Sequence, residues 1–291
     1  MNSSQKSIYY PININPYRNQ VPHYQNHFYS DLFLEDIRNF LKPKDFEISL
    51  KNSSEKDEKF IINAFDNKFN NNLTKAVSSF IVDCVLDLIY FKEANYEIVF
   101  NVSNKTPFEY IKIPFKSLKI KNNEYYQHIP EKICELKGLS MNNIKLNSDN
   151  VILFKSPNSY DELLIDSLMK ITPNLELFFK NNLNAREISY FECESLANLT
   201  KDIGWNFRLE FKSYDFLFEY YYIYRKIKFN KFLSEFRESI LLSLNESFQR
   251  ISEEINFDNQ LVWNKKPEYY DELMINFENK KYSISDIIKK L

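Results

Sequence analysis

Apolar residues recur at every third or fourth position in several stretches of the chain, a spacing that predicts amphipathic helices. These stretches are residues 30–41, 53–69, 73–92, 161–182 and 213–256, with a short capped helix at 283–291. Residues 73–92 are apolar around most of the circumference, which is typical of a helix at the centre of a core. The longest stretch carries one apolar stripe over about seven turns, made of Phe229, Phe232, Leu233, Phe236, Ile240, Leu244, Phe248, Ile251 and Ile255.

Between the third and fourth of these stretches the hydrophobic period changes to two. Alternating segments rich in β-branched and aromatic residues at 95–103, 109–120 and 124–129 predict three or four antiparallel strands. Another, short buried strand is predicted at 148–157, and a further strand at 257–264. The expected fold class is α+β, with helical segments flanking a small antiparallel sheet and a long C-terminal helix after it. We expect an extended arm at 1–30, an α+β domain at 31–212 and a helical region at 213–291.

The chain has only two glycines, Gly138 and Gly204, among 291 residues. Asparagine is the next most tolerant residue for a positive φ angle. Asn pairs and runs therefore mark the expected turns, at residues 70–72, 122–123, 142–143 and 181–182. Neither glycine lies in a phosphate-binding loop, so the nucleotide-binding motifs built on such loops are excluded.

Composition indicates a folded chain, and the chain lacks the positive net charge that favours binding to nucleic acid. The hydrophobic content is 44%, the net charge is −2, and three scattered cysteines form no disulfide framework, which favours a reducing compartment. The N-terminal residues show no signal peptide. The most apolar window, residues 76–91, is too short and too charged to cross a bilayer, so we expect a protein that is neither secreted nor membrane-embedded.

Several chemically suggestive residues have ordinary structural explanations. His23 and His27 have a spacing that suits a metal on a helix, but no third ligand lies near them in the sequence. Cys193 sits between two glutamates, which would raise its pKa rather than activate it. We expect no catalytic residue, no cofactor and no metal. A divergent metal-dependent nuclease stays open as an alternative, with Asp161, Glu162 and Asp166, and with Asp83, Asp87 and Glu97, as the acidic residues available to it.

Residues 219–232 interleave aromatic side chains with cations. Such a pattern can bind nucleic acid, or it can be a helix with one apolar and one basic face. The candidate contacts are Arg225, Lys226, Lys228 and Lys231.

The order of parts resembles the wing region of tailed-bacteriophage portal proteins, the head–tail connectors. A long apolar helix runs into "FKEANYEIVF", and "YIKIPFKSLKI", "YYQHIP", "NVILFKSP" and a helix ending in "LELFFKNNLNA" follow. Asn95 and Tyr96 match the family's first turn, Ile113 and Pro114 match the next strand, and Phe178, Phe179 and Asn181 match the last turn, where Asn182 replaces a customary glycine. The helix at 229–256, the strand at 257–264 and the terminal helix resemble the stem helix, return strand and final helix of portals. The resemblance covers residues from about 60 to 291, while the segment 186–228 is compressed and the family's crown is absent.

This resemblance implies a structural protein without an active site. Portals form a ring, typically of twelve subunits, at one capsid vertex, and double-stranded DNA passes through it during packaging and ejection. The implied partners are further copies of the chain, a terminase, capsid or tail proteins, and transient double-stranded DNA. The implied location is the virion, or the host cytoplasm during assembly. On this interpretation Asn95, Asn181 and Asn182 are turn positions, and the stripe residues Phe229, Phe232, Phe236, Ile240, Leu244 and Phe248 form the subunit interface. The alternative is a partner-binding accessory protein of a mobile element or an anti-phage system.

Overall fold

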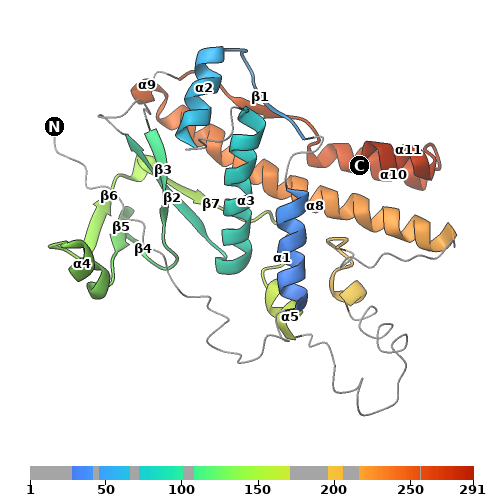
Figure 1. The fold of residues 1–291 in the computed structure, drawn as a ribbon, viewed down its shortest axis with the longest axis horizontal. Helices are drawn as coiled ribbons and strands as arrows, with labels where there is room; N and C mark the ends of the chain where they lie inside the picture. Colours follow the sequence, from blue (N-terminus) through green and yellow to red (C-terminus); the bar gives the residue numbers. More distant parts are fainter. Residues whose placement is uncertain are drawn as a thin grey trace, which may run out of the picture. The chain divides into compact units, whose positions relative to one another are not determined.

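The computed structural model describes residues 28–41, 46–65, 72–100, 108–170, 196–205, 216–255 and 257–291. Its helices are α1 (Phe28–Phe40), α2 (Glu55–Ala64), α3 (Leu73–Phe91), α4 (Glu131–Lys137), α5 (Leu164–Lys170), α8 (Phe216–Arg250), α9 (Ser252–Ile255), α10 (Pro267–Glu278) and α11 (Ile284–Lys290). Its strands are β1 (Ile48–Leu50), β2 (Ala94–Phe100), β3 (Phe108–Ile113), β4 (Leu118–Lys121), β5 (Glu124–His128), β6 (Asn143–Leu146), β7 (Val151–Phe154) and β8 (Leu261–Trp263). The expected α+β class with a long C-terminal helix is confirmed (Figure 1).

The described residues form two compact units. Of the described residues, those within Lys42–Ser156 and Ser239–Asn264 belong to the sheet unit, and those within Tyr17–Leu41, Pro157–Glu238 and Lys265–Leu291 belong to the helical unit. Helix α8 therefore contributes its residues up to Glu238 to one unit and those from Ser239 onward to the other. The predicted domain boundary at residue 212 lies outside the described residues, and that division of the chain stays a prediction.

Within the described ranges, the strands of the sheet unit pair in three separate antiparallel groups rather than in one small sheet. Their orders are β1–β8, β3–β2–β7 and β4–β5–β6. The predicted strand at 109–120 is interrupted because Pro114 follows β3 and a turn at residues 115–117 separates β3 from β4. Proline has no N–H to donate to a strand ladder, so the interruption falls where the sequence removes a hydrogen bond.

Helix α3 is the central core helix that its pattern predicted. The Asn72 side chain caps its N-terminus by accepting from the Lys75 N–H, and Lys92 ends it in a left-handed conformation. Phe80 on this helix packs against Tyr96 and Phe154, with ring centres 5.0 and 5.7 Å apart. The helix thus covers the face of the β3–β2–β7 sheet on which these rings lie (Figure 1).

Asparagine replaces glycine at some turns and not at others. Asn122 and Asn123 both have positive φ in the hairpin that joins β4 to β5, as expected for a two-residue turn. The assignment of Asn95 to a turn is wrong. Asn95 lies buried in the central strand β2, opposite Ile113 and Leu153, because the left-handed turn after α3 is completed by Lys92. Asn181 and Asn182 lie outside the described residues.

The helical unit has a core of its own. The first half of α8 packs on α10 and α11 through a cluster of buried residues, namely Ile223, Ile227, Tyr270, Leu273, Phe277 and Ile287. Phe33 of α1 packs edge-on against Trp205, with ring centres 5.1 Å apart. The Trp205 indole N–H donates to the Asp36 carboxylate at 2.9 Å, so the buried polar end of this large side chain has a partner.

Candidate functional site

Arg225, the first of the predicted nucleic-acid contacts, is buried inside the helical unit. Its guanidinium donates to the Thr200 hydroxyl at 2.5 Å, to the Ala197 carbonyl at 3.1 Å and to the Trp205 carbonyl. A planar guanidinium with five N–H donors suits several fixed carbonyls at once. Arg225 therefore joins residues 196–205 to α8 and cannot reach an external phosphate, which corrects the prediction for this residue.

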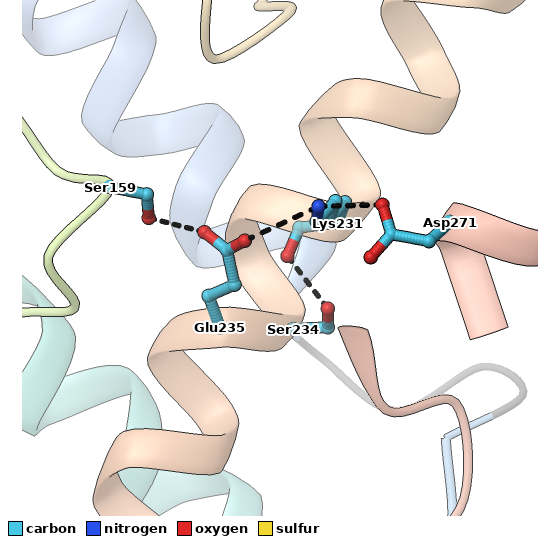
Figure 2. A network of polar contacts seen from close by, with 5 residues as sticks. All are labelled: Ser159, Lys231, Ser234, Glu235 and Asp271. Carbon is cyan, nitrogen blue, oxygen red and sulfur yellow. Dashed lines mark hydrogen bonds and ion pairs between the residues drawn. The ribbon is translucent and has the colours of Figure 1, made fainter. Parts of the chain in front are cut away.

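The three lysines of the same predicted cluster do not form a free basic surface. Lys231 lies 2.6 Å from an Asp271 carboxylate oxygen and 3.9 Å from one of Glu235. Figure 2 shows this network, in which the Ser159 hydroxyl donates to Glu235 and the Ser234 hydroxyl donates to the Lys231 carbonyl. Lys228 lies over the Tyr224 ring at 5.1 Å, and Lys226 is half-buried. Carboxylates neutralise Lys231, so the stretch 219–232 offers fewer cations to a polyanion than its sequence predicted.

The apolar stripe of α8 lies inside the chain rather than on a subunit interface. All six predicted interface residues are buried within one chain, namely Phe229, Phe232, Phe236, Ile240, Leu244 and Phe248. Phe236 packs edge-on against Tyr160 at 5.3 Å, and Phe248 packs edge-on against Phe257 at the same centre distance. The interface assignment is therefore wrong, because these side chains already have their partners inside the chain.

The acidic residues proposed for a nuclease are dispersed. Asp161 is exposed and accepts the Leu163 N–H at 2.9 Å, a local turn contact, while Asp166 lies in the first turn of α5. Across the described ranges no group of three or more His, Cys, Asp and Glu side chains could hold a metal ion. His23, His27 and Cys193 lie outside those ranges.

The sheet unit also encloses a buried polar cluster that the sequence analysis did not predict. Asp87 of α3 accepts from the Lys112 ammonium at 2.5 Å and from the Tyr96 hydroxyl at 3.5 Å. Tyr96 and Lys112 lie directly opposite each other on β2 and β3, so both point to the α3 face. Burial raises the pKa of Asp87, and burial followed by the nearby Asp87 charge raises the pKa of the Cys84 thiol. A thiol in this setting stays protonated and is a poor nucleophile.

The solvent face of the β4–β5–β6 sheet carries a group of exposed cations that the strand register brings together. Lys119, Tyr126 and Lys145 lie side by side on the three strands, and Lys121 lies opposite Glu124. The three lysines are exposed, while Tyr126 is half-buried. Glu124 accepts from both the Lys145 ammonium and the Tyr126 hydroxyl, and the Lys145 bond, followed by the Tyr126 bond, lowers the pKa of the Glu124 carboxyl. We call these four charged residues and Tyr126 the lysine face.

No protein-family model and no curated protein matches this chain. Among the helices that the structure describes, none combines the length and apolar character needed to cross a membrane.

Proposed function

We propose that the chain is the structural subunit of a portal-like ring that conducts double-stranded DNA. The proposal rests on the resemblance in the order of elements. The observation that carries it is the continuous passage from α3 through Lys92 and Glu93 into β2, the central strand of the β3–β2–β7 sheet. This is the helix-to-strand arrangement that the resemblance implies for a portal wing.

The second supporting feature is α8 with the segment that follows it. The helix has 35 residues, which corresponds to about 52 Å at 1.5 Å per residue. Strand β8 then pairs with β1, from the opposite end of the chain. A long helix followed by a returning strand is the order that the resemblance implies for a portal stem.

Because the α8 stripe is buried within the chain, the subunit contacts of such a ring must involve other residues. Contacts between copies must use side chains that a single chain leaves exposed, since a buried residue has no free surface to offer. Leu242 on α8 is 49% exposed, and Leu136 in the last turn of α4 is 76% exposed. Assembly would bury such side chains, although each exposed leucine by itself is an ordinary feature of a protein surface.

Negative-stain electron microscopy of the purified full chain tests the proposal. Closed rings with a central opening are expected, in low and in high salt alike, because subunit contacts in a stable ring are largely apolar. Uniform particles of single-chain size at every protein concentration would contradict it. Open filaments or irregular clusters would also contradict it, since a conduit needs a closed interface.

A further inference from the structure

The lysine face consists of residues that alternate along three short strands. Because successive side chains of a strand point to opposite faces, Lys119 and Lys121 share one side of β4 while Leu118 and Ile120 share the other. The paired residues on β5 and β6 extend this separation: Tyr126 and Lys145 lie with Lys119, whereas Ile144 and Leu146 belong to a buried apolar cluster. Burial of Ile144 and Leu146 therefore fixes which side of the sheet carries the charges, although Ile120 on their side of the sheet is 58% exposed.

The register sets the spacing of the cations. Lys119 and Lys145 lie on the two outer strands with Tyr126 between them, so their Cα atoms are about 10 Å apart, twice the usual distance between neighbouring strands. Lys121 lies two residues along β4 from Lys119, about 7 Å away. Figure 1 shows these three strands beside α4, and residues of α4 and of the apolar side of the sheet pack in one buried cluster. The three lysines thus form a triangle on a sheet whose other side packs against a helix.

The charge of the lysine face differs in sign from that of the chain. Three lysines and one glutamate give it a net charge of +2, while the whole chain has a net charge of −2. Lys145 remains 59% exposed although it binds Glu124, so its ammonium can still contact a ligand. Positive charge concentrated on one exposed sheet surface is complementary to a polyanion.

We propose that the lysine face binds the phosphate backbone of double-stranded DNA. The single aromatic residue among these cations favours a duplex over a single strand, because single-strand sites stack successive bases on several exposed aromatic rings. The Tyr126 hydroxyl is held by Glu124 and its ring is half-buried, so the lysines provide the contact. Contacts to phosphates do not distinguish one base from another, so binding is independent of the DNA sequence. This inference concerns one chain and does not require that a ring forms.

Fluorescence anisotropy with a short labelled DNA duplex tests the proposal. Three lysines that each neutralise one phosphate predict a slope of log affinity against log salt near −2.7, or about a 40-fold loss of affinity between 50 and 200 mM salt. The variant Lys119→Gln/Lys121→Gln/Lys145→Gln should lose at least about tenfold in affinity at the lower salt concentration and most of that slope. Glu124→Gln should bind more tightly than the unaltered chain, because it removes the one carboxylate of the face.

A matched variant separates this face from general charge effects. Lys51→Gln/Lys75→Gln/Lys132→Gln removes three exposed lysines of the same sheet unit and should change the affinity less than threefold. Equal losses in the two triple variants, or no binding by the unaltered chain at low salt, would overturn the proposal. Tighter binding to a single strand of the same length would overturn the choice of duplex. Light scattering on the same samples reports assembly separately, so a failure of DNA binding is distinguishable from a failure of ring formation.

Discussion

The Cα atom of Gly204 lies so close to the backbone of Arg225 that no side chain fits between them. A Cβ atom on Gly204 would overlap the Arg225 carbonyl oxygen and would lie 2.5 Å from the Lys228 Cβ and 2.8 Å from the Phe229 nitrogen. Gly204 also has a φ of +75°. One of the two glycines in the chain is thus required where residues 196–205 meet α8, the same place where Arg225 binds the carbonyls of that segment.

Gly204→Ala should therefore destabilise the protein more than Gly138→Ala does. Both glycines have positive φ, but a Cβ on Gly138 would meet nothing within 4 Å. Gly138→Ala should cost about 1–2 kcal/mol from the left-handed conformation alone, and Gly204→Ala should add about 1–3 kcal/mol of overpacking. Chemical denaturation of the two variants measures the difference. Equal losses would show that the contact with α8 is not tight.

Lys280→Gly should stabilise the protein. Lys280 follows α10 with a φ of +56°, and its N–H bonds the Phe277 carbonyl while the Lys281 N–H bonds that of Asn276. This is a Schellman motif with lysine at the position that usually holds glycine. Glycine relieves the strain of the left-handed conformation, but it also gives the unfolded chain more conformational freedom. The difference predicts a gain of about 0.5–1 kcal/mol in the free energy of unfolding.

Lys281→Gly is the control for that gain. It removes the same side chain from the next residue, which does not have a positive φ, so it should be neutral or mildly destabilising. The two variants are compared by their midpoints in denaturant. A gain from Lys281→Gly as large as that from Lys280→Gly would assign the effect to lost charge and not to backbone strain.

Asp87 should make stability fall as the pH rises. Burial raises its folded-state pKa above the unfolded value, so the folded chain holds this proton to higher pH than the unfolded chain does. That contribution to stability is complete below the unfolded pKa and is lost as the pH passes the folded pKa. Relative to Asp87→Asn, the unaltered protein should therefore lose unfolding free energy as the pH rises from the unfolded-state pKa of about 4 through the raised folded-state pKa. Denaturant titrations at several pH values measure the difference, and a relative gain over the same range would contradict the account.

Phe236→Ala should destabilise the chain itself, because the ring of Phe236 is fully buried beside Tyr160 and Phe232. A loss of about 3–5 kcal/mol is expected. Leu242→Ala, on the exposed side of the same helix, should cost less than about 1 kcal/mol. Thermal and denaturant unfolding compare them. If Phe236→Ala left folding intact but dissolved an assembly, the interface assignment drawn from the sequence would be restored.

The elements with strong periodicity were predictable from the sequence. Helix α3 has a clear apolar pattern and an asparagine cap, and the 3.6-residue period of α8 runs through most of its length. Helix α10 was missed although Pro267 at its first position is a usual start signal. Helix α4 was missed because its seven residues cover only two turns.

The pairing of strands was less predictable, because it depends on partners that are distant in sequence. Strand β1 has three residues and pairs with β8, more than two hundred residues away, and nothing local marks it. The separation of β3–β2–β7 from β4–β5–β6 likewise follows from tertiary packing. Glycine scarcity predicted that Asn would occupy left-handed positions, as Asn122 and Asn123 do. Lysine occupies four others in the described residues, namely Lys92, Lys116, Lys265 and Lys280.

The spacing of Arg225 along the helix indicated that it would be buried, but the basic and aromatic residues around it favoured an exposed position. Arg225 precedes Phe229 by four residues and Phe232 by seven, so it lies on the same helix face as the apolar stripe. Its neighbours in the aromatic and basic stretch suggested an outer surface instead. For the lysine face, the alternation of Lys119 and Lys121 with apolar residues was a similar signal, but Lys145 joins them only through the strand register.

Native mass in solution, measured by light scattering on the purified full chain, tests the proposed ring most directly. A closed ring should give one assembly whose mass is a fixed multiple of 35.1 kDa, near twelve chains, and unchanged on dilution over the measurable range. A mass of 35.1 kDa at every concentration would contradict it and would favour a partner-binding protein that acts as a single chain.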